Sequence, residues 1–208
     1  MRFRYVKLPV FAASILPAAW LVWGAFTDRL GANPIDAITD TTGDWTLRFL
    51  LISLAVTPLR RLTGWNQVIG LRRMLGLFAF FYATLHFGTY LVLDQFFAFD
   101  YIVADIAKRP YITVGFTAFV LLVPLAVTST KGWIRRLGRR WQLLHRLVYV
   151  SACLGVVHYL WLVKLDTTRP LRYAAALAAL LGLRLFWVFQ RRLRASTPSK
   201  ELAIRPEA

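Results

Sequence analysis

Cysteine and histidine are scarce in this chain of 208 residues, and their scarcity limits the kinds of site that the chain can build. The one cysteine, Cys153, has no partner for a disulfide within the chain. A single cysteine also excludes a zinc or iron–sulfur centre held by cysteines alone. The three histidines, His86, His145 and His158, are therefore the residues to follow in a search for a metal or cofactor site.

Acidic residues are also rare, with 10 Asp and Glu against 26 Lys and Arg, whereas 58% of all residues are hydrophobic. Such a chain is too apolar for a soluble domain of its size. A net charge of +16 in a soluble protein would favour a nucleic-acid partner, but here the basic residues lie between apolar runs, as topology signals do. We therefore expect a protein that is embedded in membrane lipid and binds no nucleic acid.

Six apolar runs are candidates to cross a hydrocarbon layer of about 30 Å as helices. They are Leu8–Phe26, Trp45–Leu59, Met74–Leu93, Tyr111–Thr128, Trp141–Val163 and Leu171–Gln190. The second run is the weakest because it contains Arg48, although an arginine near one end can extend to the interface. The sequence thus predicts an all-α integral membrane protein, with a six-helix domain over residues 1–194 and a disordered cytoplasmic tail over residues 195–208.

The basic residues alternate between the connecting segments. The N-terminal tail, the second and fourth loops and the C-terminal tail together hold 17 Lys and Arg residues, and the three other loops hold 6. Cytoplasmic segments carry the excess of Lys and Arg, so the pattern predicts an even number of spans with both termini in the cytoplasm. Without the second run, arginine-rich loops would lie on both sides of the membrane, so the charges favour six spans.

All three histidines lie in two runs that cross the membrane in the same direction: His86 in the third, and His145 and His158 in the fifth. At about 1.5 Å per residue, His86 is offset in depth by roughly 8 Å from His158 and by roughly 12 Å from His145. We expect His86 and His158 to be the axial ligands of a b-type heme near the non-cytoplasmic side. A hydrogen bond between helices is the alternative for each histidine alone.

His145 lies 13 residues before His158, which places the two about 140° apart around an ideal helix. His145 therefore needs a bend in the helix, or it serves a second cofactor or a polar contact. Arg72 is expected near the cytoplasmic surface, where its guanidinium is a candidate partner for a heme propionate or another anionic cofactor near His145; it is alternatively a topology-setting arginine. The aromatic candidates to line a heme slot, or to pack in the ordinary way, are Phe78, Phe81, Tyr82, Tyr149 and Tyr159.

The segments around the histidines resemble those of the ferric-reductase-like transmembrane heme proteins. They are more similar still to the MsrQ family (formerly YedZ), the heme-binding membrane subunits of a periplasmic protein-methionine-sulfoxide reductase system. The resemblance covers nearly the whole chain and rests on Arg72-Arg73-Met-Leu-Gly-Leu leading into Ala-Thr-Leu-His86, and on Trp141-Gln-Leu-Leu-His145-Arg-Leu-Val-Tyr followed by Val-Val-His158-Tyr. His86, His145 and His158 match the heme-associated histidines of the family, and Arg72 matches an arginine of its motif.

This resemblance implies a multi-pass protein of the bacterial inner membrane that binds b-type heme and, in some accounts, FMN. It implies electron transfer from the quinone pool or a cytosolic flavin reductase to a periplasmic molybdopterin enzyme, the catalytic subunit that reduces methionine sulfoxide in oxidised proteins. The chain itself would be an electron-transfer subunit without catalytic residues. Compared with larger ferric reductases and NADPH oxidases, its third run lacks a second histidine and has Arg72 and Arg73 at its cytoplasmic end instead, which puts a second bis-histidine site in doubt.

Two other classes of function stay open at the level of sequence. One is a self-contained ferric or cupric reductase that uses the same heme to reduce metal outside the cell. The other is a transporter or assembly factor in which the histidines relay protons or join helices. The near-absence of Asp and Glu from the apolar runs weighs against proton-coupled transport. The absence of a GxGxxG fingerprint indicates that electrons come from a partner or a quinone rather than directly from NADH.

Overall fold

The computed structural model describes residues 3–196, with side chains from Val6 to Leu193, and shows helices but no strand in that part of the chain. In chain order the elements are α1 (Phe3–Phe26), α2 (Pro34–Thr63), the 3-10 helix η1 (Asn66–Leu71), α3 (Arg72–Gly88), the π-helix η2 (Thr89–Asp94), α4 (Phe99–Lys108), α5 (Pro110–Val127), α6 (Lys131–Leu137), α7 (Arg139–Leu144), α8 (Leu147–Leu162) and α9 (Thr168–Ser196). The last two helical residues, Ala195 and Ser196, begin the predicted tail, and residues 197–208 lie outside the described part.

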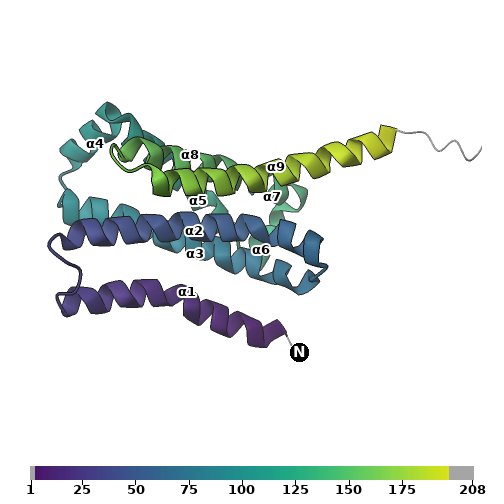
Figure 1. Cartoon of the computed structure of the whole chain (residues 1–208), viewed down its shortest axis with the longest axis horizontal. Helices are drawn as coiled ribbons and strands as arrows, with labels where there is room; N and C mark the ends of the chain where they lie inside the picture. Colours follow the sequence, from purple (N-terminus) through teal and green to yellow (C-terminus); the bar gives the residue numbers. More distant parts are fainter. Residues whose placement is uncertain (1–2, 197–208) are drawn as a thin grey trace, which may run out of the picture.

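The long helices lie side by side along the longest axis of the molecule (Figure 1). The most extensive helix–helix contacts are those of α2 with α3 and of α5 with α8. A shared apolar core joins these two pairs, and Phe49, Leu54, Ala79 and Ala152 are among its most buried members. Outside them, α1 packs along one flank and α9 along another, so the two pairs form the centre of the bundle (Figure 1).

Five helical segments of the described chain are long and apolar enough to cross a membrane. They are Val6–Phe26, Asn66–Asp94, Pro110–Val127, Arg139–Leu162 and Thr168–Leu193, and they overlap five of the six predicted spans. The chain is therefore an all-α, multi-pass membrane protein. The predicted span Trp45–Leu59 is helical and lies within α2, but α2 is not among the five because polar and charged residues such as Asp44 and Arg48 interrupt its apolar sequence.

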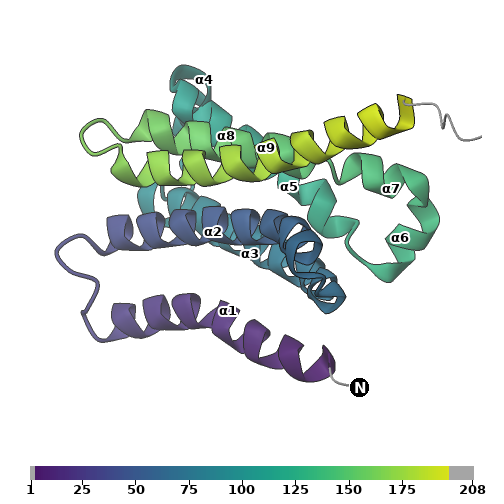
Figure 2. The same ribbon diagram turned by 45° about the vertical axis from the view of Figure 1, so that its right-hand side comes forward.

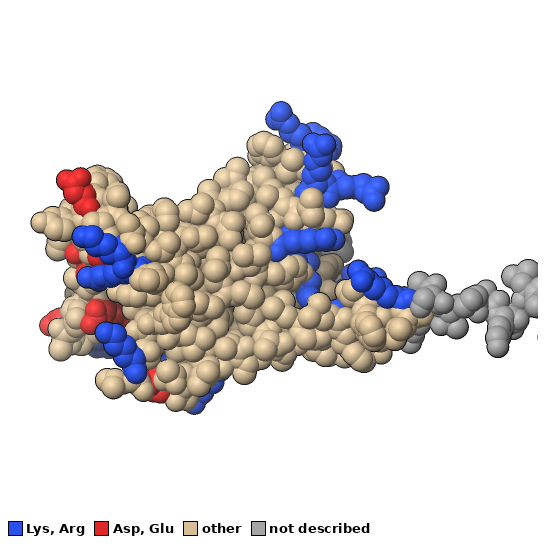
Figure 3. All heavy atoms as spheres, turned by 90° about the horizontal axis from the view of Figure 1, so that it is seen from above, with Lys and Arg blue, Asp and Glu red and all other residues tan. Residues whose placement is uncertain are grey.

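Charge is segregated between the two ends of the bundle. All eight Asp residues between Val6 and Leu193 lie at the end formed by the α1–α2 loop and the start of α2, by η2 and α4, and by the α8–α9 loop. We call this the acidic end, although it also carries basic residues; the opposite end, where α2 ends and α3 begins, is the basic end. On the face seen in Figure 3, red side chains appear only at the acidic end, and the far end carries blue ones alone.

Short elements cover both ends of the central helices. At the acidic end, η2 extends α3 beyond Gly88, and α4 lies between η2 and α5 (Figure 2). At the basic end, α6 and α7 form a hairpin that turns at Gly138, which has a positive φ of 51°. The α-helical path from α7 into α8 is interrupted by a turn at His145 and Arg146.

Candidate functional site

A cavity of about 290 Å³ lies between α2, α3, α5 and α8 in the half of the bundle nearer the acidic end. His86 of α3 and His158 of α8 both line it, and the centroids of their rings are 6.2 Å apart at an interplanar angle of 76°. The two rings therefore lie close together despite the depth offset of roughly 8 Å that the sequence predicts between His86 and His158. We call this space the outer cavity, and most of its remaining wall is apolar, with Leu47, Phe87 and Phe119 among the lining residues.

Each of the two imidazoles is oriented by a backbone carbonyl of the neighbouring helix. His86 Nδ1 lies 3.0 Å from the carbonyl oxygen of Thr39 in α2, and His158 Nδ1 lies 2.7 Å from that of Tyr111 in α5. A carbonyl oxygen can only accept, so Nδ1 is the N–H donor in both rings and Nε2 keeps its lone pair. An imidazole in this tautomer, with its second nitrogen held by a carbonyl, is the usual form of a metal ligand.

A glycine faces each imidazole from the same neighbouring helix. A Cβ atom at Gly43 would lie 3.1 Å from Cε1 of His86, and one at Gly115 would lie 2.7 Å from Nδ1 of His158. Ordinary carbon contacts are about 3.5–4.0 Å, so a side chain would be too close to the imidazole at both positions, and most of all at Gly115. Glycine at these two positions allows the imidazoles to stand close against α2 and α5.

The two histidine environments repeat with a constant shift of 72 residues, from 39 to 111, from 43 to 115 and from 86 to 158. Each imidazole–carbonyl hydrogen bond accordingly joins residues 47 positions apart. The pair α2–α3 and the pair α5–α8 are therefore two copies of one arrangement, in which one helix supplies a carbonyl and a glycine and the next supplies a histidine. The bundle brings the two copies face to face across the outer cavity.

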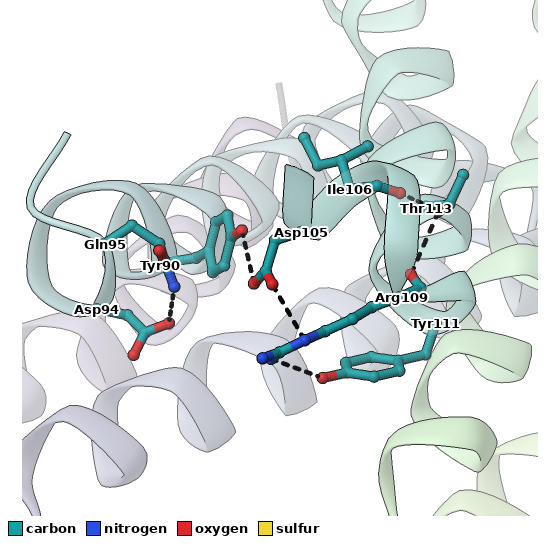
Figure 4. A network of polar contacts seen from close by, with 8 residues as sticks. All are labelled: Tyr90, Asp94, Gln95, Asp105, Ile106, Arg109, Tyr111 and Thr113. Atoms are coloured by element: carbon teal, nitrogen blue, oxygen red, sulfur yellow. Dashed lines mark hydrogen bonds and ion pairs between the residues drawn. The ribbon is translucent and has the colours of Figure 1, made fainter. Parts of the chain in front are cut away.

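Polar residues border the outer cavity at the acidic end. Arg109 is the one Lys or Arg side chain among the lining residues of this cavity. Its Nε lies 3.0 Å from a carboxylate oxygen of Asp105, and its Nη1 donates to the Tyr111 hydroxyl at 3.3 Å (Figure 4). Tyr90 of η2 donates its hydroxyl to Asp105 at 3.3 Å, which ties α4 to the end of α3 (Figure 4). The network thus connects η2, which continues the helix of His86, with Tyr111 of α5, whose carbonyl holds His158.

Two further carboxylates of the border, Asp40 and Asp44, come from the first turns of α2. Asp44 forms an ion pair with Arg48 at 3.3 Å. Asp40 lies ahead of the predicted span Trp45–Leu59, and burial raises the pKa of its carboxyl, with a further increase from the negative charges of Asp36 and Asp44. The acidic end of the cavity therefore has a carboxyl group that holds its proton more strongly than usual.

A second cavity, of about 480 Å³, lies toward the basic end, and we call it the inner cavity. Arg72, Arg73 and His145 all line it, so the structure brings Arg72 and His145 to one space, separate from that of His86 and His158. The His145 ring stacks on Trp141 with centroids 3.9 Å apart, and its Nε2 lies 3.1 Å from the Thr128 hydroxyl. Because that hydroxyl donates to the Pro124 carbonyl, it accepts a hydrogen bond from His145.

The repeat of 72 residues also relates residues of the inner cavity. The position equivalent to His145 in the first copy is 73, which holds Arg73, another lining residue. The inner cavity therefore has one imidazole and an arginine where the outer cavity has two imidazoles. No Asp or Glu lines the inner cavity, so its cationic side chains have no carboxylate partner among the lining residues.

Several residues of the two sites were not identified from the sequence. Gly43, Gly115 and the carbonyls of Thr39 and Tyr111 support the histidines, and the common shift of 72 residues is the one signal that points to them. At the inner cavity, the guanidinium of Arg184 in α9 donates to the hydroxyl of Tyr149, a lining residue. Arg184 lies inside the predicted run Leu171–Gln190 rather than in a connecting segment, and that position is the sequence signal that could have identified it.

The aromatic residues proposed for a heme slot have different positions. Tyr159 lines the outer cavity and Tyr149 the inner one. Tyr82 is fully buried, and its hydroxyl donates to the Ser14 carbonyl and accepts from the Ala18 amide, so it fastens α3 to α1. Phe78 and Phe81 also pack outside both cavities, where Phe78 contacts Phe11 of α1. These three residues are structural.

The fold and the site define a class of membrane protein: a multi-pass helical bundle in which two helix pairs present histidines that face each other across a cavity. The family described as the ferric reductase like transmembrane component matches residues 42–156, which include Gly43, His86 and Gly115. A curated relative from Herminiimonas arsenicoxydans is 56% identical over 190 residues, covering 90% of this chain and 87% of that protein. A relative from Rhodospirillum rubrum is 53% identical over 199 residues, covering 95% of this chain and 96% of that protein.

Both relatives bear the name protein-methionine-sulfoxide reductase heme-binding subunit MsrQ, as does one from Ralstonia nicotianae that is 54% identical over 190 residues, with 90% of this chain and 88% of that protein covered. The chain belongs to the MsrQ family of ferric-reductase-like transmembrane proteins. No solved structure matches the chain.

Proposed function

We propose that this protein is the heme-binding electron-transfer subunit of a protein-methionine-sulfoxide reductase system. In this proposal a b-type heme lies in the outer cavity with His86 and His158 as its axial ligands. Such a heme would supply electrons for a molybdopterin catalytic subunit in the periplasm, which reduces methionine sulfoxide in oxidised proteins. The relatives support this assignment, because their names describe heme-binding subunits of such a reductase.

The geometry of the two imidazoles is the observation that carries the proposal. A histidine nitrogen binds a transition metal at about 2 Å, and the ring centre lies about 1 Å behind that nitrogen, so two axial imidazoles should have centroids about 6 Å apart. The observed separation is 6.2 Å. Both rings also present Nε2 with a free lone pair, because Nδ1 donates to a carbonyl. The residues present therefore fit a bis-histidine heme.

The ligand set determines which chemistry the site supports. When bound, the heme supplies a one-electron redox centre, and two histidine ligands leave no open position for oxygen or substrate. The chain's own residues orient the ligands through the Thr39 and Tyr111 carbonyls and exclude water with an apolar wall. At the acidic end, Arg109 is the cation available to a heme propionate. The site thus transfers electrons rather than converts a substrate.

The proposed topology has six spans, with both termini and the basic end in the cytoplasm. The 30 residues of α2 extend about 45 Å, longer than a hydrocarbon layer of about 30 Å, so α2 is long enough to be the sixth span. It lies at the centre of the bundle, in contact with α1, α3, α8 and α9 (Figure 1). The excess of Lys and Arg at the basic end supports the orientation in a bacterial inner membrane. Residues 1–194 form the membrane domain in this proposal.

The inner cavity is the proposed place where electrons arrive. Its arginines and His145 would bind an anionic cofactor, either the propionates of a second heme or the phosphate of FMN. Arg72 is the proposed phosphate or carboxylate partner, and His145 either ligates iron or contacts the cofactor. The physiological donor in this proposal is a quinol of the membrane or a cytosolic flavin reductase, both of which would reach the basic end.

A reoxidation assay tests the proposed function. The purified protein is reduced by a quinol or by a flavin reductase with NADH, and the heme absorbance is followed after addition of the molybdopterin catalytic subunit with methionine sulfoxide. We expect rapid reoxidation that requires both the catalytic subunit and the sulfoxide, and none in His158→Ala. Reoxidation by a ferric or cupric chelate alone, with no response to the catalytic subunit, would instead establish a self-contained metal reductase.

A further inference from the structure

We propose that Gly43 and Gly115 are positioning residues for the two heme ligands, each keeping open the space in which one imidazole stands. The inference rests on the proposed function, since it takes His86 and His158 as the axial ligands. It concerns how α2 and α5, which carry no histidine, determine whether both ligands reach the same iron.

The contact is tightest at Gly115. A Cβ atom there would lie 2.7 Å from Nδ1 of His158 and 2.9 Å from both Cγ and Cε1 of the same ring. The ring is held in place, because Nδ1 donates to the Tyr111 carbonyl at 2.7 Å and the ring stacks on the Tyr111 side chain. An added methyl group must therefore displace the imidazole or push α5 away from α8.

Gly43 has the same role with slightly more space. A Cβ atom there would lie 3.1 Å from Cε1 and 3.2 Å from Nδ1 of His86. The imidazole is held by the Thr39 carbonyl at 3.0 Å, and the Thr42 hydroxyl lies 3.4 Å from the same nitrogen. A shift of a few tenths of an ångström would admit the methyl group. The expected effect of an alanine is therefore smaller at Gly43 than at Gly115.

Helix propensity would favour alanine at both positions. Glycine in a helix interior is less stable than alanine by about 1 kcal/mol, so Gly43 and Gly115 do not serve the stability of their own helices. At Gly76, Gly88 and Gly182 a Cβ atom would meet nothing within 4 Å. In α2 and α5 it would meet the histidine that faces the cavity, and the separation of 43 residues between glycine and histidine is the same in both copies. The arrangement thus occurs twice in one chain.

The experiment compares Gly115→Ala and Gly43→Ala in the full-length, heme-loaded protein with two matched controls. Gly24→Ala, in α1, places a Cβ 2.7 Å from Cδ2 of the Leu30 side chain, so it creates an equally short contact away from both cavities. Gly88→Ala adds a methyl group in open space on the same helix as His86. The readouts are the low-spin heme signal in electron paramagnetic resonance, the midpoint potential, heme per chain, and assembly by size-exclusion chromatography in detergent.

We expect Gly115→Ala to lose most of its low-spin signal and to recover it when free imidazole is added, since the missing ligand is an imidazole. Gly43→Ala should lose less of the signal and shift the midpoint potential. Both controls should keep the signal and potential of the unmodified protein, whatever Gly24→Ala does to stability. If Gly115→Ala fails to assemble, the comparison of Gly43→Ala with Gly24→Ala decides the question.

Two results separate failure of this inference from failure of the proposed function. If Gly43→Ala and Gly115→Ala match the controls while His86→Ala and His158→Ala lose the low-spin signal, the glycines have no positioning role and the heme site stands. If the two histidine variants keep the signal, the axial ligands are elsewhere and the proposed function of this cavity is wrong.

Discussion

The outer and inner cavities are built from the same two helix pairs but differ in the residues that they present. The outer cavity has two imidazoles, two carbonyls that orient them and two glycines that admit them. The inner cavity has His145 in one copy and Arg73 at the equivalent position of the other, with Arg72 beside it. One repeated framework thus provides a symmetric ligand set in one half of the bundle and a cationic, asymmetric one in the other.

The difference shows which part of the site belongs to the framework and which to individual side chains. The shift of 72 residues sets where a side chain from α3 faces one from α8. Whether that position holds a metal ligand or an anion partner depends on a single residue in each copy. The predictions that follow alter the comparison one residue at a time.

Substitution of Arg72 should have the largest effect on the inner cavity. Arg72→Leu removes a guanidinium from a cavity that has no lining carboxylate, and we expect loss of the anionic cofactor there. The measurement is cofactor content, by heme and flavin analysis, in the purified protein. Arg72→Lys should retain part of it. The signal from the outer heme should be unchanged in both, and its loss would mean that the two cavities are not independent.

Introduction of a histidine at position 73 should make the two cavities more alike. Arg73→His places an imidazole opposite His145, at the position equivalent to it in the other copy. We expect heme per chain or the share of low-spin heme to rise. Since His145 Nε2 currently bonds to Thr128, Thr128→Val in the same background should increase the gain. No change in either variant would show that the repeat does not govern the inner cavity.

Neutralisation of Arg109 should change the potential of the outer heme but not its binding. Arg109→Gln removes the only Lys or Arg charge of the outer cavity wall, which favours the more positive ferric state and lowers the midpoint potential. The shift should be a few tens of millivolts at most, since the side chain is largely exposed. A redox titration measures it. A rise in potential would contradict the proposed position of Arg109 near the heme.

Asp40 should give the outer heme a small pH dependence. Burial and neighbouring carboxylates raise the pKa of this carboxyl, so it ionises above the usual range of aspartates. Each ionisation adds negative charge that stabilises ferric heme, so the midpoint potential should fall as pH rises through the raised pKa. Redox titrations at several pH values should show this slope reduced in Asp40→Asn. An equal slope in the variant would assign the proton to another group.

The sequence was sufficient for the helical class and for the proximity of His86 and His158. Five of the six spans predicted from hydropathy are long apolar helical segments of the described chain, and counting residues from the basic loops placed His86 nearer in depth to His158 than to His145. The angle between residues 13 positions apart also left a polar contact open for His145, and the structure shows one with Thr128. These predictions depend on the lengths of the apolar runs and on the number of residues between each histidine and the nearest basic loop. Both can be counted in a single sequence.

The supporting residues were not predictable in the same way. Thr39 and Tyr111 act through their backbone carbonyls. The two equivalent positions therefore hold different side chains, and the repeat is not visible there in the sequence. A glycine inside a helix carries no positive signal until its neighbour is known. Tyr82 was a candidate for the heme slot because aromatic residues suit both a cofactor and a core, and the contact with α1 that decides between them is long-range.

The most direct test of the central claim is a reduced-minus-oxidised absorbance spectrum of the purified protein, with heme quantified per chain, for His86→Ala, His158→Ala and His145→Ala. Our account predicts that the first two variants lose the low-spin b-type signal of the outer heme and that His145→Ala keeps it. Retention of that signal in both His86→Ala and His158→Ala, in correctly assembled protein, would contradict the account.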